Sequence, residues 1–247
     1  MEEFHETTQN PNFKKFMNIT QLLIFSNNNE YDDSCIAPLQ GAFYGTPDLE
    51  EVKFNFFREE DSKINSALSA INENTEKLIL QDTNMVSIFG TKEYATNKEI
   101  NSPTNRVITS LLCKNRVRTI LRYGIAYVNT VENLVNKIEK HIMRYPQLFA
   151  TFAIEKKLDS GVRKGIIWHT QGSGKTAVAF FNVHYLSDYY QKKNTIAKFY
   201  FITDRLDLAT QAKNEFESRG LKVEVVSSKE DFIKSIKSPV AISGNLG

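Results

Sequence analysis

The amino-acid sequence predicts an α/β fold for the second half of the chain, in which helices cover a parallel sheet. Apolar runs with the composition of buried strands cover residues 165–168, 197–202 and 221–226. Stretches with apolar residues at helical spacing follow the first two runs, over 177–190 and 206–219, after short connections. Strands that alternate with helices in this way are typical of a parallel, doubly wound sheet.

Length and composition limit the possible classes of protein. The 247 residues are enough for one large domain or two ordinary ones, and 41% hydrophobic with 24% charged residues is a globular composition. The formal net charge of +2 is too small to indicate nucleic-acid binding, so any such site must be local. Cys35 and Cys113 are too few for a disulfide framework and lack metal-ligand spacing, which favours reduced, buried thiols.

The sequence carries no signal for export or for membrane insertion. The N-terminal stretch MEEFHETTQNPNF is acidic and polar, unlike a secretory signal peptide. No apolar run approaches the roughly 20 residues that a membrane-spanning helix needs. We therefore expect a cytoplasmic protein that does not act on a membrane.

The most specific signal is the stretch from Lys164 to Thr176, KGIIWHTQGSGKT, which leads from a predicted strand into a predicted helix. A strand, a glycine loop, Gly-Lys-Thr and a helix in this order form the phosphate-binding P-loop. Gly172 and Gly174 allow backbone N–H groups to turn toward the phosphates, because a side chain would block that approach. The helix that follows directs its positive dipole end to the same place. An ordinary strand-to-helix turn is the alternative.

Two side chains of the P-loop are the candidate catalytic residues. Lys175 should reach the β- and γ-phosphates of ATP, and Thr176 should place its hydroxyl on Mg²⁺, so ATP and Mg²⁺ are the expected cofactors. His169 stands where the pattern usually has glycine, and a packed, partly buried histidine is the favoured interpretation. The remaining loop residues expected to contact the nucleotide are Thr170, Gln171, Gly172, Ser173 and Gly174.

The first half of the chain predicts short strands followed by helices. Runs at 18–26, 41–45 and 52–57 read as strands separated by turns, which suggests the strand-rich tail of a domain. Residues 61–123 read mostly as helix. Asp61-Ser62 is expected to begin a helix that runs to about Leu80.

Three further elements are predicted up to residue 158. Ser102-Pro103 should begin a helix, because proline favours the first helical position. Residues 124–128 read as a strand, 131–143 as an amphipathic helix and 148–158 as an apolar helix. A basic stripe of Lys114, Arg118 and Arg122 could contact phosphates, although a solvated helix face is the favoured interpretation.

Two elements are predicted after residue 220. Ser228 with Asp231 resembles a capping box at the start of a short helix. Residues 240–243 read as the beginning of a further strand.

Three stretches of the sequence resemble the motor (R) subunit of type I restriction-modification enzymes. They are WHTQGSGKT in the P-loop, DRLDLATQ at 204–211 and RYPQ at 144–147, and the stretch IFSNNNEYDD at 24–33 is similar to the segment after the nuclease core of that family. The resemblance covers nearly the whole chain. It implies a superfamily 2 DNA translocase with a nuclease-like domain on its N-terminal side.

The resemblance implies a domain organisation. Residues 1–60 would be the C-terminal remnant of a nuclease-like domain, 61–128 a helical connecting region, and 129–247 the first RecA-like lobe with a parallel sheet. No Asp-Glu-Ala-His sequence is present, so the lobe is expected to be truncated before the Walker B motif. The nuclease residues would then lie upstream of residue 1, and the Walker B motif and arginine finger beyond 247.

The resemblance also implies roles for individual residues. Gln147 matches the glutamine that recognises adenine, and an amide can both donate to and accept from the base. Arg144 and Tyr145 would flank the base. An ordinary exposed helix start is the alternative for Gln147. The segment 204–211 would lie against the DNA backbone, with contacts from Asp204, Arg205 and Gln211. A capped helix start is an equally open interpretation of that segment.

The function implied by the resemblance is the ATP-binding part of the DNA-translocating, DNA-cleaving subunit of a type I restriction endonuclease. Its expected partners are double-stranded DNA and the methyltransferase and specificity subunits of the complex. The 247 residues would not be competent for catalysis alone. A nucleotide-dependent binding or scaffold fragment without catalytic activity is the alternative. A P-loop phosphotransferase is disfavoured, because Gln147 and residues 204–211 would have no role in it.

Overall fold

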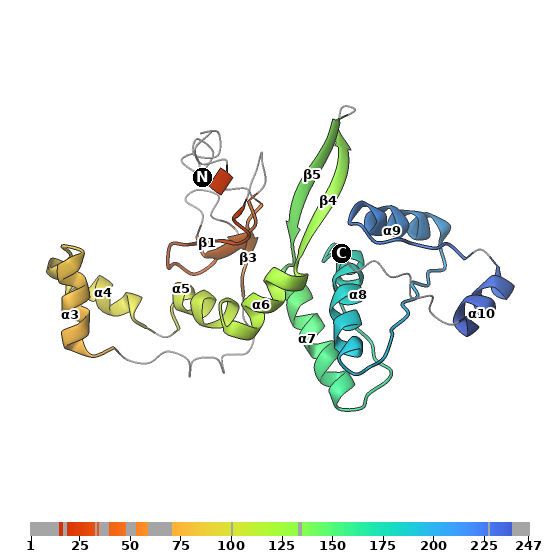
Figure 1. Ribbon diagram of the computed structural model, residues 1–247. Helices are drawn as coiled ribbons and strands as arrows, with labels where there is room; N and C mark the ends of the chain where they lie inside the picture. Colours follow the sequence, from red (N-terminus) through yellow and green to blue (C-terminus); the bar gives the residue numbers. More distant parts are fainter. Residues whose placement is uncertain are drawn as a thin grey trace. The chain divides into compact units, whose positions relative to one another are not determined.

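The computed structural model separates the chain into two compact units, residues 1–125 and 126–247, and each is described by itself (Figure 1). Among the residues it describes, no helix is both long and apolar enough to cross a membrane. The described residues are 15–16, 19–32, 34, 40–47, 53–58, 71–99, 101–132, 135–226 and 228–238.

The first unit begins with a small antiparallel sheet. Its strands are β1 (Leu23–Ser26), β2 (Ala42–Gly45) and β3 (Asn55–Phe56), in the order β1-β2-β3. Tyr44 in β2, which lies opposite Ile24 of β1, is completely buried, and the ring of Phe57 packs edge-on against it. The three short strands predicted from the sequence are therefore confirmed.

After the sheet, the described residues of the first unit are mostly helical. The helix α3 starts after its N-cap Asn72, whereas the predicted helix start at Asp61-Ser62 lies outside the described residues. Ser102 caps the helix that starts with Pro103, as predicted. The helical elements are α3 (Glu73–Asp82), η2 (Val86–Ile88), α4 (Lys92–Asn97), α5 (Pro103–Arg106), the π-helical η3 (Val107–Leu111) and α6 (Lys114–Tyr123).

The basic stripe lies on α6. Lys114, Arg118 and Arg122 are all exposed, and the Arg122 guanidinium lies over the ring of Tyr123, 5.3 Å from its centroid. This arrangement fits a solvated helix face, the interpretation favoured from the sequence.

A hairpin replaces the helix that was predicted over 131–143. The strands β4 (Ile125–Glu132) and β5 (Val135–Ile142) pair with each other. In β4, Ala126 and Val128 are buried while Tyr127 between them is exposed, which is the two-residue period of a strand. The helix prediction was wrong because the apolar residues of this short segment fit both periods, and pairing with β4 decides between them.

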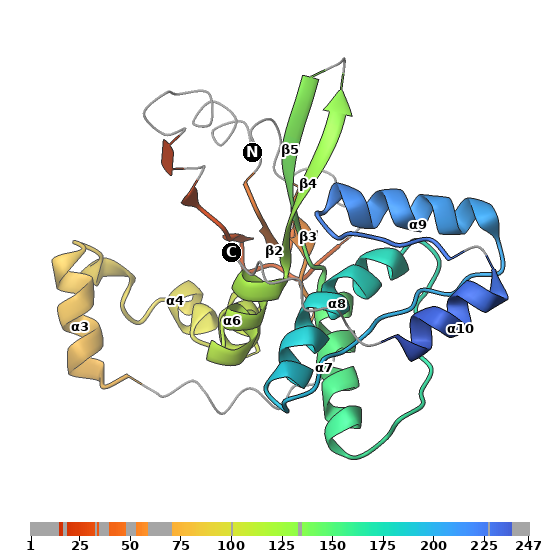
Figure 2. The same cartoon turned by 45° about the vertical axis from the view of Figure 1, so that its right-hand side comes forward.

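The described residues of the second unit continue with four helices: α7 (Tyr145–Asp159), α8 (Lys175–Gln191), α9 (Leu206–Ser218) and α10 (Lys229–Lys237). They confirm the helices predicted from the sequence. Gly220 closes α9 with φ +84°, and the Ser228 hydroxyl caps α10 by accepting from the Asp231 N–H at 3.1 Å. The helices α7 and α8 lie side by side in both views (Figures 1 and 2).

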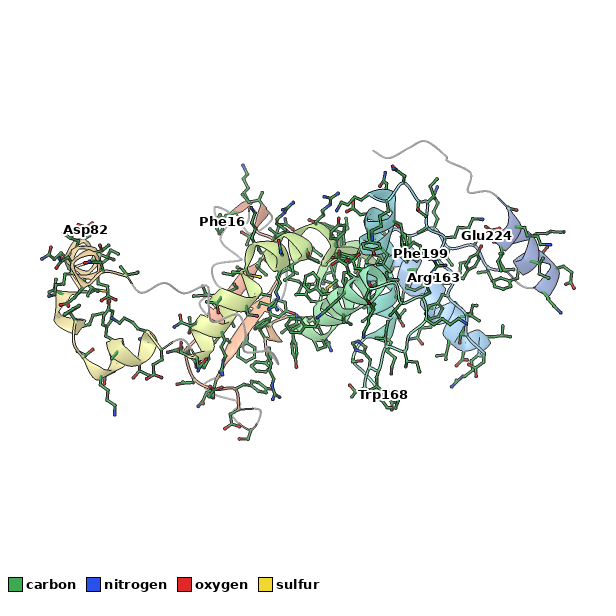
Figure 3. The ribbon with its side chains drawn as sticks, turned by 90° about the horizontal axis from the view of Figure 1, so that it is seen from below. Phe16, Asp82, Arg163, Trp168, Phe199 and Glu224 are labelled. Carbon is green, nitrogen blue, oxygen red and sulfur yellow. The ribbon has the colours of Figure 1, made fainter. Side chains whose placement is uncertain are left out.

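The described residues of the second unit do not form the predicted parallel sheet. No strand is formed by the segments 165–168, 197–202 and 221–226. The described residues therefore form a mixed fold of helices and two small sheets. Ile166 is 92% exposed and Trp168 is 89% exposed, and Figure 3 places Trp168 at the margin of the unit. A strand needs a paired neighbour for its backbone groups, and these segments have none within the described part. The predicted strand at 240–243 lies outside the described residues.

Candidate nucleotide-binding site

The P-loop has the backbone geometry that its glycines allow. Gly172 and Gly174 both have φ +77°, in the left-handed region that residues with side chains rarely adopt. Gly174 is also the N-cap of α8, so the loop passes directly into the helix. The backbone conformation therefore favours glycine at both positions, while the expected contact of their N–H groups with phosphates stays a prediction.

The Thr170 carbonyl is the centre of the loop's internal contacts. It accepts hydrogen bonds from the Ser173 hydroxyl at 2.7 Å, from the Ser173 N–H at 3.4 Å and from the Lys175 ammonium at 3.2 Å. Lys175 therefore lies across the loop. Because the contact is exposed, a phosphate group could replace the carbonyl as the partner of the ammonium group.

The free hydrogen-bonding groups of the loop fit a triphosphate with its magnesium ion. Within the described range 135–226, the N–H groups of Gly174, Lys175 and Thr176 donate to no carbonyl, and the Thr176 hydroxyl has no partner. These groups surround the N-terminus of α8, where the helix dipole favours an anion. Thr176 is the residue that would bind Mg²⁺ through its hydroxyl, and Lys175 the residue that would neutralise phosphate charge.

The structure brings Gln147 to the P-loop. Its side chain is only 3% exposed. The amide oxygen accepts from the Arg144 N–H at 2.9 Å, and the amide nitrogen donates to the carbonyls of Ser173 and Gly174, each at 3.3 Å. Both ends of the amide are therefore engaged. The amide oxygen keeps a second lone pair, so it could accept from the adenine amino group while its contacts with the loop stay in place.

The other residues predicted to contact the nucleotide lie on α7 next to Gln147 or in the P-loop itself. Arg144 is the exposed N-cap of α7, and Tyr145 is half-buried with its ring edge-on to Phe149, 6.1 Å between centroids. His169 is half-buried, whereas Thr170 and Gln171 are exposed.

Sequence reasoning missed two buried polar residues next to this site. Thr151 on α7 is completely buried, and Asn182 on α8 is 7% exposed. The Asn182 amide nitrogen donates to the Thr151 hydroxyl at 3.2 Å and to the Val178 carbonyl at 2.8 Å. The signal in the sequence is an asparagine on the apolar side of a helix, four residues after a buried valine, which calls for a specific hydrogen-bond partner.

The predicted DNA-contacting segment is an exposed helix start. Arg205 is the N-cap of α9, and Asp204 and Gln211 are exposed. The Arg205 guanidinium forms an ion pair with Asp207, with Nε 3.1 Å from Oδ1. This hydrogen bond from Arg205 lowers the pKa of the Asp207 carboxyl. The pair is therefore intact above that lowered pKa and is lost as the pH falls through it.

The ion pair gives a prediction for DNA binding. Asp207→Asn should strengthen binding to duplex DNA, because it frees the positive charge of Arg205 for a phosphate. The dependence of log K on log salt should steepen by about one, the value for one additional phosphate contact. Fluorescence anisotropy with a labelled duplex at several salt concentrations measures both. Asp231→Asn on α10 removes the same charge elsewhere. An equal gain for both variants would mean that net charge alone is responsible.

The comparisons with known proteins first define a class. Residues 130–243, which include the P-loop, match the SWI2/SNF2 ATPase family. This part of the second unit is therefore similar to SWI2/SNF2 ATPases, which agrees with the ATP-binding and helicase-like character predicted from the sequence.

The chain is similar to the endonuclease subunits of type I restriction enzymes, as predicted. It is 35% identical over 131 residues to the putative type I restriction enzyme MjaVIIP endonuclease subunit of Methanocaldococcus jannaschii. This alignment covers 48% of the present chain and 12% of the relative. It is 31% identical over 143 residues to the type I restriction enzyme SsaAORF53P endonuclease subunit of Staphylococcus saprophyticus. That alignment covers 57% of the present chain and 14% of the relative. The aligned part thus spans a small fraction of these relatives. No solved structure matches the chain.

Proposed function

We propose that the chain is the ATP-binding part of the DNA-translocating, DNA-cleaving subunit of a type I restriction endonuclease. The observation that carries the proposal is the P-loop, in which two left-handed glycines, a lysine and a threonine meet at a helix N-terminus. The similarity to type I restriction endonuclease subunits supports the proposed substrate, double-stranded DNA, and a complex with methyltransferase and specificity subunits.

The proposal includes a RecA-like parallel sheet in the second unit. The extended segments next to the helices carry large apolar side chains that are left in water, such as Ile166, Trp168 and Ile202. Pairing of these segments into a sheet between helices would bury such side chains, since parallel sheets are apolar on both faces. The domain boundaries expected from the sequence, at residues 60 and 128, belong to the same proposal.

In this proposal the chain's own residues bind and orient the nucleotide. Lys175 and the free N–H groups of the loop would hold the phosphates, and Thr176 would hold Mg²⁺, which supplies charge neutralisation for phosphoryl transfer. The segment with Asp204, Arg205 and Gln211 would lie on the DNA backbone.

Binding of nucleotide to this chain tests the proposal. Calorimetry should detect ATP in the presence of Mg²⁺, and a fluorescent ATP analogue should be displaced by ATP. Duplex DNA should stimulate phosphate release by a protein in which this chain is extended past residue 247. Nucleotide binding without any effect of DNA would favour a scaffold function over a motor.

The role proposed for Gln147 gives a separate prediction. Gln147→Ala should weaken ATP more than inorganic triphosphate, because only ATP has the adenine edge that an amide can recognise. The preference for ATP over GTP should fall as well. Competition against a fluorescent nucleotide measures all three ligands. An equal loss for ATP and triphosphate would rule out adenine recognition and leave only the contact between Gln147 and the loop.

A further inference from the structure

A row of hydrogen bonds joins α7 to α8 along their whole shared length. The two partners of each bond are 30 or 31 residues apart in sequence, and successive bonds are about one helical turn apart. The two helices therefore run in the same direction. From the loop end downward, the pairs are Thr151 with Asn182 at 3.2 Å, Glu155 with Tyr185 at 2.6 Å, and Asp159 with Tyr189 at 2.7 Å.

The row ends at the P-loop. The Thr151 hydroxyl, which accepts from Asn182, donates in turn to the Gln147 carbonyl at 3.0 Å. The Gln147 side chain then donates to the carbonyls of Ser173 and Gly174. A continuous path of hydrogen bonds thus connects the middle of α8 to the loop at its start.

Packing alone does not explain Asn182. Its amide oxygen is buried and has no hydrogen-bond partner among the described residues, although its amide nitrogen has two. A leucine of similar size would fill the same space without a buried unsatisfied group. The donation to Thr151 is therefore the feature that distinguishes asparagine from an apolar residue here. Hydrogen bonds are directional, so this one fixes the position of α7 along α8, which apolar contacts would leave less defined.

We propose that Asn182 and Thr151 are positioning residues for the P-loop, which act through Gln147. They fix the position of α7 along the axis of α8 so that the Gln147 amide reaches the carbonyls of Ser173 and Gly174. The part of this inference that concerns nucleotide affinity rests on the proposed ATP-binding function. The part that concerns the shape of the free loop does not.

The experiment compares Asn182→Leu and Thr151→Val with the parent chain. Amide hydrogen exchange at the two hydrogen-bonded amides of the loop and its helix start, Ser173 to the Thr170 carbonyl and Val178 to the Gly174 carbonyl, measured without nucleotide, should be several-fold faster in both variants, because the loop loses its support. The affinity for ATP with Mg²⁺ should fall about fivefold, a typical coupling between contacting residues. In a Gln147→Ala background, Asn182→Leu should have almost no further effect on either quantity.

The control is Tyr185→Phe, which removes the bond to Glu155 from the same interface but further from the loop. It should leave exchange in the loop and ATP affinity unchanged, and thermal unfolding of all variants reports the general loss of stability. Additive effects of Asn182→Leu and Gln147→Ala, or loop exchange as fast in Tyr185→Phe as in Asn182→Leu, would overturn the inference. A parent chain that binds no ATP would instead refute the proposed function, and the exchange measurement would still decide the positioning role.

Discussion

Lys175→Ala should weaken binding of ATP by roughly 10- to 150-fold, since a charge-assisted hydrogen bond contributes about 1.5–3 kcal/mol. The ammonium group is the one positive side chain at the start of α8, and in the free loop it is held by the Thr170 carbonyl. Its removal would leave the phosphates with the backbone N–H groups, the helix dipole and the Mg²⁺ that Thr176 would hold. Calorimetric titration with ATP in the presence of Mg²⁺ gives the affinity directly.

Lys192→Ala is the matched control for this variant. Lys192 follows the last residue of the same helix, where it pairs with Asp188 at 2.6 Å and is largely exposed. The substitution changes the net charge by the same amount but lies far along α8 from the loop. ATP affinity should stay within about twofold of the parent, because exposed ion pairs contribute little. Undiminished ATP binding by Lys175→Ala would show that this loop is not the nucleotide site.

Gly174→Ala should lower both the free energy of unfolding and the affinity for ATP. The residue has φ +77°, where a side chain costs about 1–3 kcal/mol. An added Cβ would also stand 2.6 Å from the Gln147 amide nitrogen, which must then leave the Ser173 and Gly174 carbonyls. The displaced amide is buried, so its lost hydrogen bonds add roughly 1–3 kcal/mol. Urea unfolding measures the first effect and calorimetry the second.

Gly172→Ala separates the two causes. Gly172 has the same φ of +77°, but an added Cβ there meets nothing within 4 Å. It should therefore show the loss from backbone strain without the loss from displacing Gln147. Equal destabilisation by the two substitutions would contradict the close contact between Gly174 and Gln147.

The P-loop could be predicted from the sequence because local chemistry determines it. The left-handed backbone at 172 and 174 favours glycine whatever surrounds the loop, and the Gly-Lys-Thr sequence before a helix is a local signal. For Gln147 the sequence predicts only that it lies near the nucleotide site, and not that its side chain contacts the loop. Which atoms meet depends on how α7 lies along α8, a packing relation across 27 residues that no local pattern contains.

The hairpin of β4 and β5, unlike the P-loop, could not be predicted from local sequence. Residues 131–143 are compatible with helix and strand periods, and the choice is made by pairing between β4 and β5. The segment 165–168 illustrates the same dependence, because its apolar residues match a strand but the described residues offer it no neighbour. The ion pair of Arg205 with Asp207 was also missed, although Arg205 is the N-cap and Asp207 the second residue of the same helix.

The common direction of α7 and α8 has an electrostatic consequence. Each helix behaves as if it carried about half a positive charge at its N-terminus and half a negative charge at its C-terminus. Because Gln147 in the first turn of α7 contacts Gly174 at the start of α8, the two positive ends lie together beside the loop. At the other end the two negative ends meet, and the Lys193 ammonium lies there, 3.0 Å from Asp159. The helix pair is thus a single enlarged dipole that directs its attraction for anions to the place where the phosphates would bind.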